Sequence, residues 1–134
     1  MTVTASLAEN LLGTGVVSTT PVAGGDICVA TRLRLTDGTN ALIKTRPNAP
    51  ARFFAIEAAG LEQLRTAGGA PVPEVLGVNE ECLILSWIEP GKPQPETAES
   101  FGRALSATHA AGAPTFGAEK DGFIGLAPLP NGPK

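Results

Sequence analysis

Hydrophobic residues alternate with small or polar ones along segment 27–35, which is the period of a half-buried strand. Its apolar face would consist of Ile27, Val29, Leu33 and Leu35. The β-branched segment 16–22 and the apolar segment 41–45 predict strands before and after it. The pair Asp37-Gly38 is a tight-turn signal between the second and third strands. The three segments therefore predict an antiparallel meander with a glycine loop at its first turn.

Three further segments predict helices. The first covers residues 3–12 and ends before a glycine. The second starts at Asn48-Ala49-Pro50, since proline is tolerated in a first helical turn, and runs to about Thr66. The third covers residues 97–111. Its apolar stripe consists of Phe101, Leu105 and His109, so we expect this histidine to be packed rather than catalytic.

The middle of the chain predicts two more strands and a break. Segment 75–78 is a short apolar run, and segment 82–88 is almost continuously apolar, which is typical of a central strand buried on both faces. Residues 89–95 contain three prolines and a glycine and predict a linker or hinge. Residues 113–134 are rich in glycine and proline and have no clear period.

Three features point to phosphate chemistry when they are taken together. Gly24-Gly25 joins two strands, where glycine lets backbone N–H groups approach a phosphate. Lys44 ends the third strand, and Glu57 lies within an apolar stripe of the second helix. The other members of that stripe are Phe54, Leu61 and Leu64. Each feature alone also fits an ordinary explanation: a hairpin, a strand-end charge that reaches solvent, or a buried ion pair.

A carboxylate that faces a core is costly unless it is paired. Glu57 therefore needs a cation, and Lys44 is the nearest lysine in the sequence. A strand lysine paired with a helix glutamate beside a glycine loop is an arrangement that holds ATP phosphates. In such a fold, backbone groups after the fifth strand pair with adenine, and here this segment would be Ser86 to Ile88, with Leu85 at its inner end. The alternatives are a purely structural ion pair and a strand that simply leaves the sheet.

Composition restricts the class of protein. The chain has 134 residues, of which 43% are hydrophobic and 17% charged, which is typical of a folded domain. A net charge of −3 argues against nucleic acid or anionic membranes as partners. No secretory signal, membrane-length apolar run or metal-ligand spacing is present, so we expect a reduced, cytoplasmic protein. Cys28 is interpreted as a small core-facing residue or a strand residue in preference to a redox thiol.

Several longer stretches together resemble a known family. They are VAGGDICVATRLRLTDGTNALIKT, FFAIEAAGLEQL, VPEVLGV, LILSWIEPG and FGRALSATHAAGAPTFGAEKDGFIGLAPLPNG. They cover about residues 15–132 and resemble the fructosamine (ketosamine-3-) kinase family, which is related to aminoglycoside phosphotransferases and choline kinases. The resemblance implies an α+β fold, namely a protein-kinase-like small lobe with a five-stranded antiparallel sheet plus one helix. It also implies four parts: an N-terminal helical segment 1–14, an ATP-binding small lobe 15–88, a hinge 89–95 and the start of a large lobe 96–134.

The resemblance assigns roles on the phosphate side of a nucleotide site. Gly24, Gly25 and Asp26 would cover the phosphates of ATP. Lys44 would bind the α- and β-phosphates and would be held by Glu57. Mg²⁺ would accompany ATP, with its protein ligands in the missing large lobe.

On the adenine side, the resemblance implies that Leu42 packs on the base. The carbonyl of Ser86 and the N–H of Ile88 would bind its edge. The family's reaction is ATP-dependent phosphorylation of the sugar 3-hydroxyl of fructosamines and related ketosamines, a deglycation repair step. The implied partners are ATP and a ketosamine-type small molecule or a glycated protein.

The sequence also departs from this family. The catalytic loop of the H-G-D-x-x-x-x-N type and the later metal-binding aspartate motif are absent. None of the three aspartates, Asp26, Asp37 and Asp121, is placed to act as the catalytic base. We therefore expect a fragment or a truncated gene product that has no catalytic residue of its own and is inactive alone. The alternatives are an aminoglycoside- or choline-kinase-like phosphotransferase lobe and a non-catalytic nucleotide-binding fragment.

Overall fold

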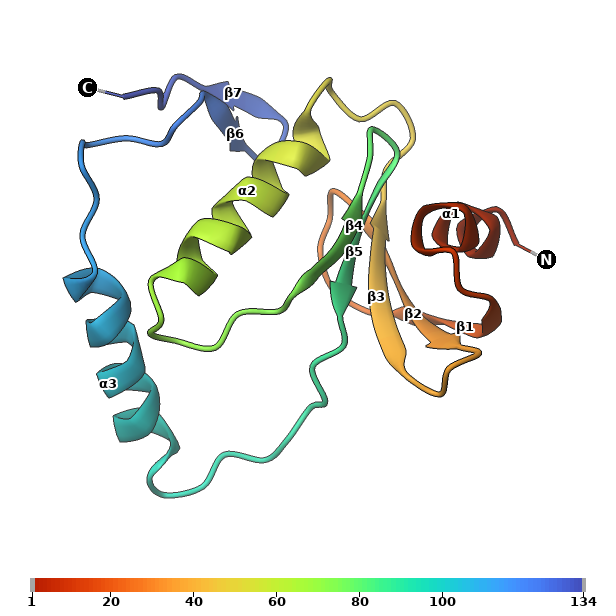
Figure 1. Cartoon of the computed structure of the whole chain (residues 1–134), viewed down its shortest axis with the longest axis horizontal. Helices are drawn as coiled ribbons and strands as arrows, with labels where there is room; N and C mark the ends of the chain where they lie inside the picture. The colour runs from red at the N-terminus through yellow and green to blue at the C-terminus, as the bar shows by residue number, and fades with distance from the viewer. Residues whose placement is uncertain (1, 134) are drawn as a thin grey trace.

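The computed structural model describes residues 2–133 and is built around a five-stranded antiparallel sheet of order β1-β2-β3-β5-β4 (Figure 1). Its strands are β1 (Val16–Val22), β2 (Val29–Leu35), β3 (Asn40–Thr45), β4 (Val75–Val78) and β5 (Cys82–Ser86). The helices are α1 (Val3–Leu12), α2 (Phe53–Thr66) and α3 (Thr97–Ala110). A separate hairpin is formed by β6 (Gly122–Ile124) and β7 (Ala127–Leu129). The predicted α+β fold is confirmed.

Helix α1 covers one face of the sheet. The Thr2 hydroxyl accepts a hydrogen bond from the Ala5 N–H at 3.1 Å, and Gly13 ends the helix in the left-handed conformation with φ +68°. The missing side chain of Gly77 lets Leu11 approach β4 closely. The buried cluster beneath α1 consists of Ala8, Leu33, Leu35, Ala41, Ile43, Cys82 and Ile84.

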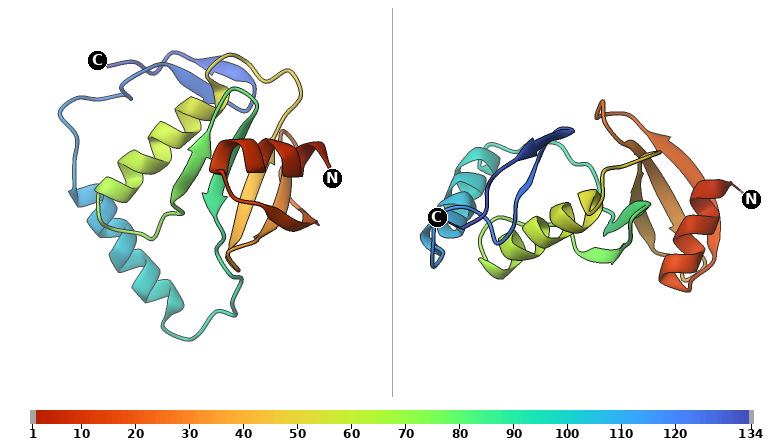
Figure 2. Two further views of the ribbon diagram at one scale, coloured as in Figure 1. Left: turned by 45° about the vertical axis from the view of Figure 1, so that its right-hand side comes forward. Right: turned by 90° about the horizontal axis from the view of Figure 1, so that it is seen from above.

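Helix α2 packs on the opposite face, and Figure 2 shows the two helices on either side of the sheet. Phe54 and Ala58 of α2 are buried against Leu83 and Leu85 of β5. Because successive strand residues point to opposite faces, Cys82 and Ile84 join the α1 cluster. Strand β5 is therefore buried on both faces, as its continuous apolar run predicted.

The prediction for the start of α2 was wrong. The helix begins at Phe53, because Asn48 and Arg52 adopt left-handed backbone conformations with φ +54° and +64°. A residue in that conformation cannot continue a right-handed helix. The apolar stripe is also shorter than predicted, since Leu64 is 46% exposed.

Two predicted strand ends also differ. Strand β2 begins at Val29 rather than Ile27, because the glycine loop extends to that point. Val29, which was predicted on the apolar face of this strand, is 60% exposed. Strand β5 ends at Ser86 rather than Ile88. The pairing with β3 ends where Ala41 lies opposite Ser86, so Trp87 and Ile88 are outside the ladder.

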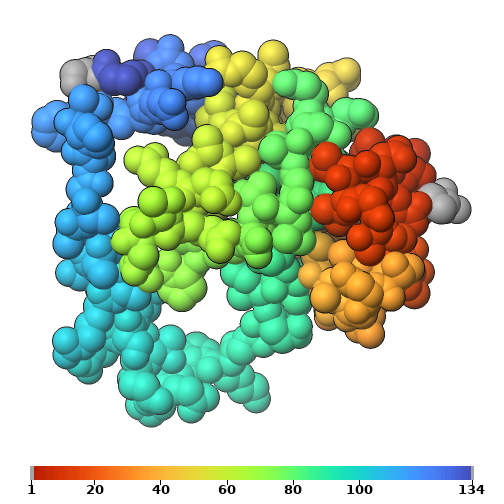
Figure 3. Space-filling view, in the orientation of Figure 1, coloured from red at the N-terminus to blue at the C-terminus, as the bar shows by residue number. Residues whose placement is uncertain are grey.

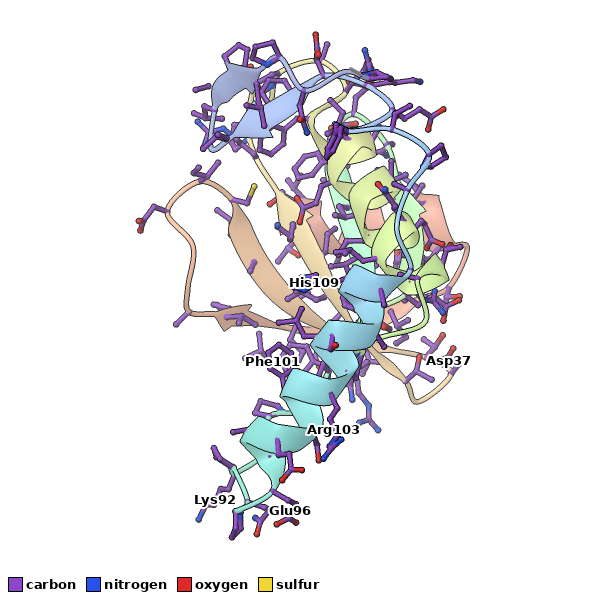
Figure 4. The ribbon with its side chains drawn as sticks, turned by 90° about the vertical axis from the view of Figure 1, so that its left-hand side faces the viewer. Asp37, Lys92, Glu96, Phe101, Arg103 and His109 are labelled. Carbon is purple, nitrogen blue, oxygen red and sulfur yellow. The ribbon has the colours of Figure 1, made fainter. Side chains whose placement is uncertain are left out.

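Helix α3 lies apart from the sheet and contacts the rest of the structure near Gly69. Gly69 lies so close to Thr108 of α3 that a Cβ added to this glycine would be 2.2 Å from the Thr108 hydroxyl. Figure 3 shows an opening between α3, the hinge before it and the sheet. Phe101, which is 55% exposed, and the exposed His109 lie on one side of α3, opposite Arg103 (Figure 4). The expectation of a packed histidine is therefore wrong for this chain.

The segment without a clear period contains the β6–β7 hairpin, which sequence analysis did not predict. Its turn contains Gly125 with φ +58°. The Asp121 carboxylate accepts a hydrogen bond from the Gly132 N–H at 2.7 Å and so closes the base of the hairpin. No helix among residues 2–133 is long and apolar enough to cross a membrane.

Replacing Ile43 by alanine tests the importance of the α1 cluster. Ile43 is fully buried, so Ile43→Ala should lower the free energy of unfolding by about 2–5 kcal/mol. The measurement is urea denaturation followed by circular dichroism. Val17→Ala on the same sheet is the matched control, because Val17 is 65% exposed and should change stability by less than about 0.5 kcal/mol. Equal effects of the two substitutions would contradict the assignment of the core.

Candidate functional site

A cavity of about 740 Å³ lies between the glycine loop, the α2 side of the sheet and α2 itself. Six of the eight residues predicted to form a site line it: Gly24, Gly25, Asp26, Leu42, Lys44 and Glu57. They come from the β1–β2 loop, from β3 and from α2. The fold thus gathers most of the predicted site at one place.

The predicted lysine–glutamate pair is present. Lys44 Nζ lies 2.5 Å from Glu57 Oε1, and the two side chains are 26% and 32% exposed. Lys44 extends from the α2 face of β3, where Ala30 of β2 and Leu83 of β5 are its neighbours across the ladder. Glu57 therefore faces the cavity and a cation, and not the closed apolar core.

The glycine loop owes its shape to backbone conformations that other residues rarely adopt. Gly24 and Gly25 have φ values of +118° and +79°. A Cβ on Gly24 would meet no atom within 4 Å, so the conformation, and not crowding, requires glycine there. At the end of the loop, the Arg46 guanidinium donates a hydrogen bond to the Ile27 carbonyl. This bond ties the loop to the residue that follows β3.

An apolar wall lies beside the paired charges. Leu42 stands opposite Leu85 of β5 on the same face of the sheet, and Val22 and Ala30 continue the wall toward the glycine loop. The sequence predicts Leu42 against the base and Leu85 at the inner end of the adenine-binding segment. The alternation of β2 also places Ala30 on the face opposite Leu33 and Leu35.

Two predicted residues do not line this cavity. The Ser86 N–H donates to the Glu74 carbonyl at 2.9 Å, and the Ser86 hydroxyl accepts from the Glu74 N–H at 2.9 Å. Ile88 lies two residues beyond the end of β5 and is 60% exposed. The roles implied for these two residues concern the Ser86 carbonyl and the Ile88 N–H, and these roles remain predictions.

The β6–β7 hairpin closes one end of the cavity. The ring of Phe123 lies 5.4 Å from that of Phe53, measured between centroids. Phe123 and Gly125 both line the cavity, and a Cβ on Gly125 would lie 3.0 Å from Ile27 of the glycine loop. The only signal in the sequence was the resemblance of this stretch to the family.

Cys28 lines the cavity directly after the glycine loop and is half-buried. Burial raises the pKa of its thiol, and the nearby Lys44 ammonium opposes part of that shift. A raised pKa leaves little thiolate at neutral pH. Cys28 lies in the loop before β2 and packs against the cluster beneath α2. It is therefore a small core-facing residue, as one of the two interpretations predicted.

Two carboxylates outside the cavity have clear structural partners. Asp37 accepts hydrogen bonds from the Thr39 N–H at 2.8 Å and the Thr39 hydroxyl at 2.6 Å, which lowers the pKa of Asp37. The Glu9 carboxylate accepts from the Val16 N–H at 2.8 Å. Within residues 2–133, no group of three histidine, cysteine, aspartate or glutamate residues could hold a metal ion.

The sequence is similar to proteins named as probable ketoamine kinases. One from Thermus thermophilus is 38% identical over 110 residues, which cover 82% of this chain and 38% of that protein. One from Enterococcus faecium is 35% identical over 107 residues, which cover 78% of this chain and 37% of that protein. This chain thus spans well under half the length of these relatives.

Solved structures agree with the sequence comparison. The crystal structure of a fructosamine-3-kinase homologue from Thermobifida fusca matches 98% of this chain and 47% of its own, with a TM-score of 0.90 and 36% identity. A homologue from Haemophilus somnus is similar in fold, with a TM-score of 0.81 and 17% identity. The family model of fructosamine kinases matches residues 1–134. The chain therefore belongs to the fructosamine kinase family.

Proposed function

We propose that this chain is the ATP-binding lobe of a kinase that phosphorylates the sugar 3-hydroxyl of ketosamines. The observation that carries the proposal is the Lys44–Glu57 pair inside a cavity roofed by Gly24 and Gly25. A strand lysine held by a helix glutamate is the arrangement that positions ATP phosphates in kinases. Gly24 and Gly25, above this ion pair, offer backbone N–H groups to a phosphate and have no side chains that would occupy its space.

The cavity suggests how ATP would lie. The adenine would rest against Leu42 and its apolar neighbours, with the Ser86 carbonyl and the Ile88 N–H at its edge. The triphosphate would extend toward Lys44 and the loop that ends at Asp26. Mg²⁺ would accompany the triphosphate, because it binds phosphate oxygens and keeps several of its waters. Residues 15–88 would then form the binding lobe and residues 89–95 the hinge.

The chemical step would need groups that this chain does not supply. Asp37 and Asp121 are engaged in turns outside the cavity, and Asp26 lies in the glycine loop above the phosphates. None of these positions suits a catalytic base, which has to take the proton from the hydroxyl group of the substrate that is phosphorylated. We therefore infer that the 134-residue chain binds ATP in the cytoplasm but does not turn it over alone. The acceptor in the complete kinase would be a ketosamine or a glycated protein.

Isothermal titration with MgATP tests the proposal directly. Lys44→Ala should weaken binding about tenfold or more, because a charge-assisted hydrogen bond contributes about 1.5–3 kcal/mol. Lys92→Ala is the matched control, since Lys92 is exposed in the hinge and lies outside the cavity, and it should bind like the unmodified chain. Addition of fructosyl-lysine should release no ADP.

Three results would contradict the proposal. The first is that the unmodified chain binds no MgATP, and the second is that Lys44→Ala and Lys92→Ala bind it equally well. The third is sustained ADP release, which would refute the expectation of no turnover. Circular dichroism of each variant separates a loss of binding from a loss of fold.

Labelling of Cys28 provides a second test. Because burial raises the pKa of this thiol, the rate of alkylation by iodoacetamide should keep rising with pH beyond about 8.5, the ordinary cysteine value. Saturating MgATP should slow the labelling at every pH, because the nucleotide would fill the cavity that Cys28 lines.

Mass spectrometry of the labelled peptide assigns the reaction to Cys28. Cys82 serves as the internal control, because it is fully buried beneath α1 and should remain unlabelled in the folded chain. A rate for Cys28 that MgATP leaves unchanged would argue against a nucleotide in this cavity.

A further inference from the structure

Three side chains meet where the chain leaves the sheet for the hinge. The Arg32 guanidinium carbon lies 4.6 Å from the centroid of the Trp87 ring. The Trp87 indole N–H donates to Glu89 Oε2 at 2.9 Å, and Arg32 Nη2 lies 3.8 Å from that same oxygen. The guanidinium therefore contacts both the face of the ring and the carboxylate that holds the edge of the ring.

This cluster joins two parts of the structure that are not paired by strand contacts. Arg32 lies in β2, directly opposite Leu42 of β3, on the face that carries the apolar wall of the cavity. Trp87 and Glu89 follow Ser86, the last residue of β5. The cluster thus connects the sheet beside the cavity to the first residues of the hinge.

The hinge backbone needs such a connection. The last paired position of β5 is Ser86, opposite Ala41, and the seven residues 89–95 contain three prolines and a glycine. Proline has no N–H for a ladder, so this segment cannot extend the sheet. Trp87 lies between the two residues whose backbone groups are expected to meet adenine.

We propose that Arg32 is a positioning residue that holds the hinge at Trp87 in the conformation that binds the adenine edge. The inference rests on the proposed function and deepens it. Arg32 acts through the Trp87 ring and through Glu89, and the phosphates are bound elsewhere, by Lys44. Its removal should therefore weaken recognition of the base and leave recognition of the triphosphate unchanged.

The expected effect is moderate. The side chains of Arg32 and Glu89 are 36% and 72% exposed, so the ion pair between them contributes little. The stacking of the guanidinium on the ring is the larger contribution. Arg32→Ala should weaken ATP binding about three- to fivefold and change binding of inorganic tripolyphosphate by less than about 1.5-fold. Arg32→Lys keeps a cation over the ring, so its affinity for ATP should lie between that of the unmodified chain and that of Arg32→Ala.

Trp87 also provides a direct optical signal, because it is the only tryptophan in the chain. Arg32→Ala should shift its emission to longer wavelength, since loss of the guanidinium uncovers one face of the ring to water. The matched control is Arg34→Ala, on the same face of β2 but exposed and outside the cavity lining. It should change neither the emission nor either affinity.

The experiment measures the affinities for MgATP and for tripolyphosphate, together with tryptophan emission, on the full 134-residue chain and each variant. Unchanged ATP affinity in Arg32→Ala would overturn the inference. Equal weakening of ATP and tripolyphosphate binding would also overturn it, because Arg32 would then act on the phosphates or on the fold. If the unmodified chain binds tripolyphosphate but has no preference for ATP, the inference fails while the phosphate site stands. If it binds neither ligand, the proposed function itself fails.

Discussion

The contact between Lys44 and Glu57 joins β3 to α2 inside the cavity and holds the positive charge of the cavity in place. An ion pair whose side chains are 26% and 32% exposed contributes little net stability, because the lost hydration offsets much of the attraction. The attachment of α2 rests instead on Phe54 and Ala58 against β5. The pair keeps a cation in place at the edge of an open cavity, which is what the proposed binding of phosphates requires.

The regular parts of this fold could be predicted from the sequence because their signals are local. The alternation along β2 and the continuous apolar run of β5 follow directly from which faces of the sheet are covered. Glu57 was found for a similar reason, since a carboxylate within a helical apolar stripe has to have a cation nearby. The nearest lysine in the sequence is the correct partner, since Lys44 Nζ and Glu57 Oε1 lie 2.5 Å apart.

The parts that could not be predicted depend on contacts between distant segments. The β6–β7 hairpin has short strands and is held by Phe123 against Phe53 and by Asp121 against Gly132, and no local period encodes such contacts. The late start of α2 depends on the left-handed conformation of Arg52, a residue that rarely adopts it. The apolar stripe of α3 indicates that a face can be covered but does not identify what covers it, and in this chain Phe101 and His109 of that stripe are exposed.

The two faces of the sheet serve different purposes, and the alternation within each strand keeps them separate. In β3, Ala41 and Ile43 are fully buried beneath α1, whereas Leu42 and Lys44 face the cavity. A register shift of one residue would exchange these faces and place an ammonium group in the closed core. The apolar cluster under α1 thus fixes the register of β3, and through the register it fixes the position of Lys44. The α1 cluster lies on the face opposite the cavity, yet it determines where the cavity's charge is placed.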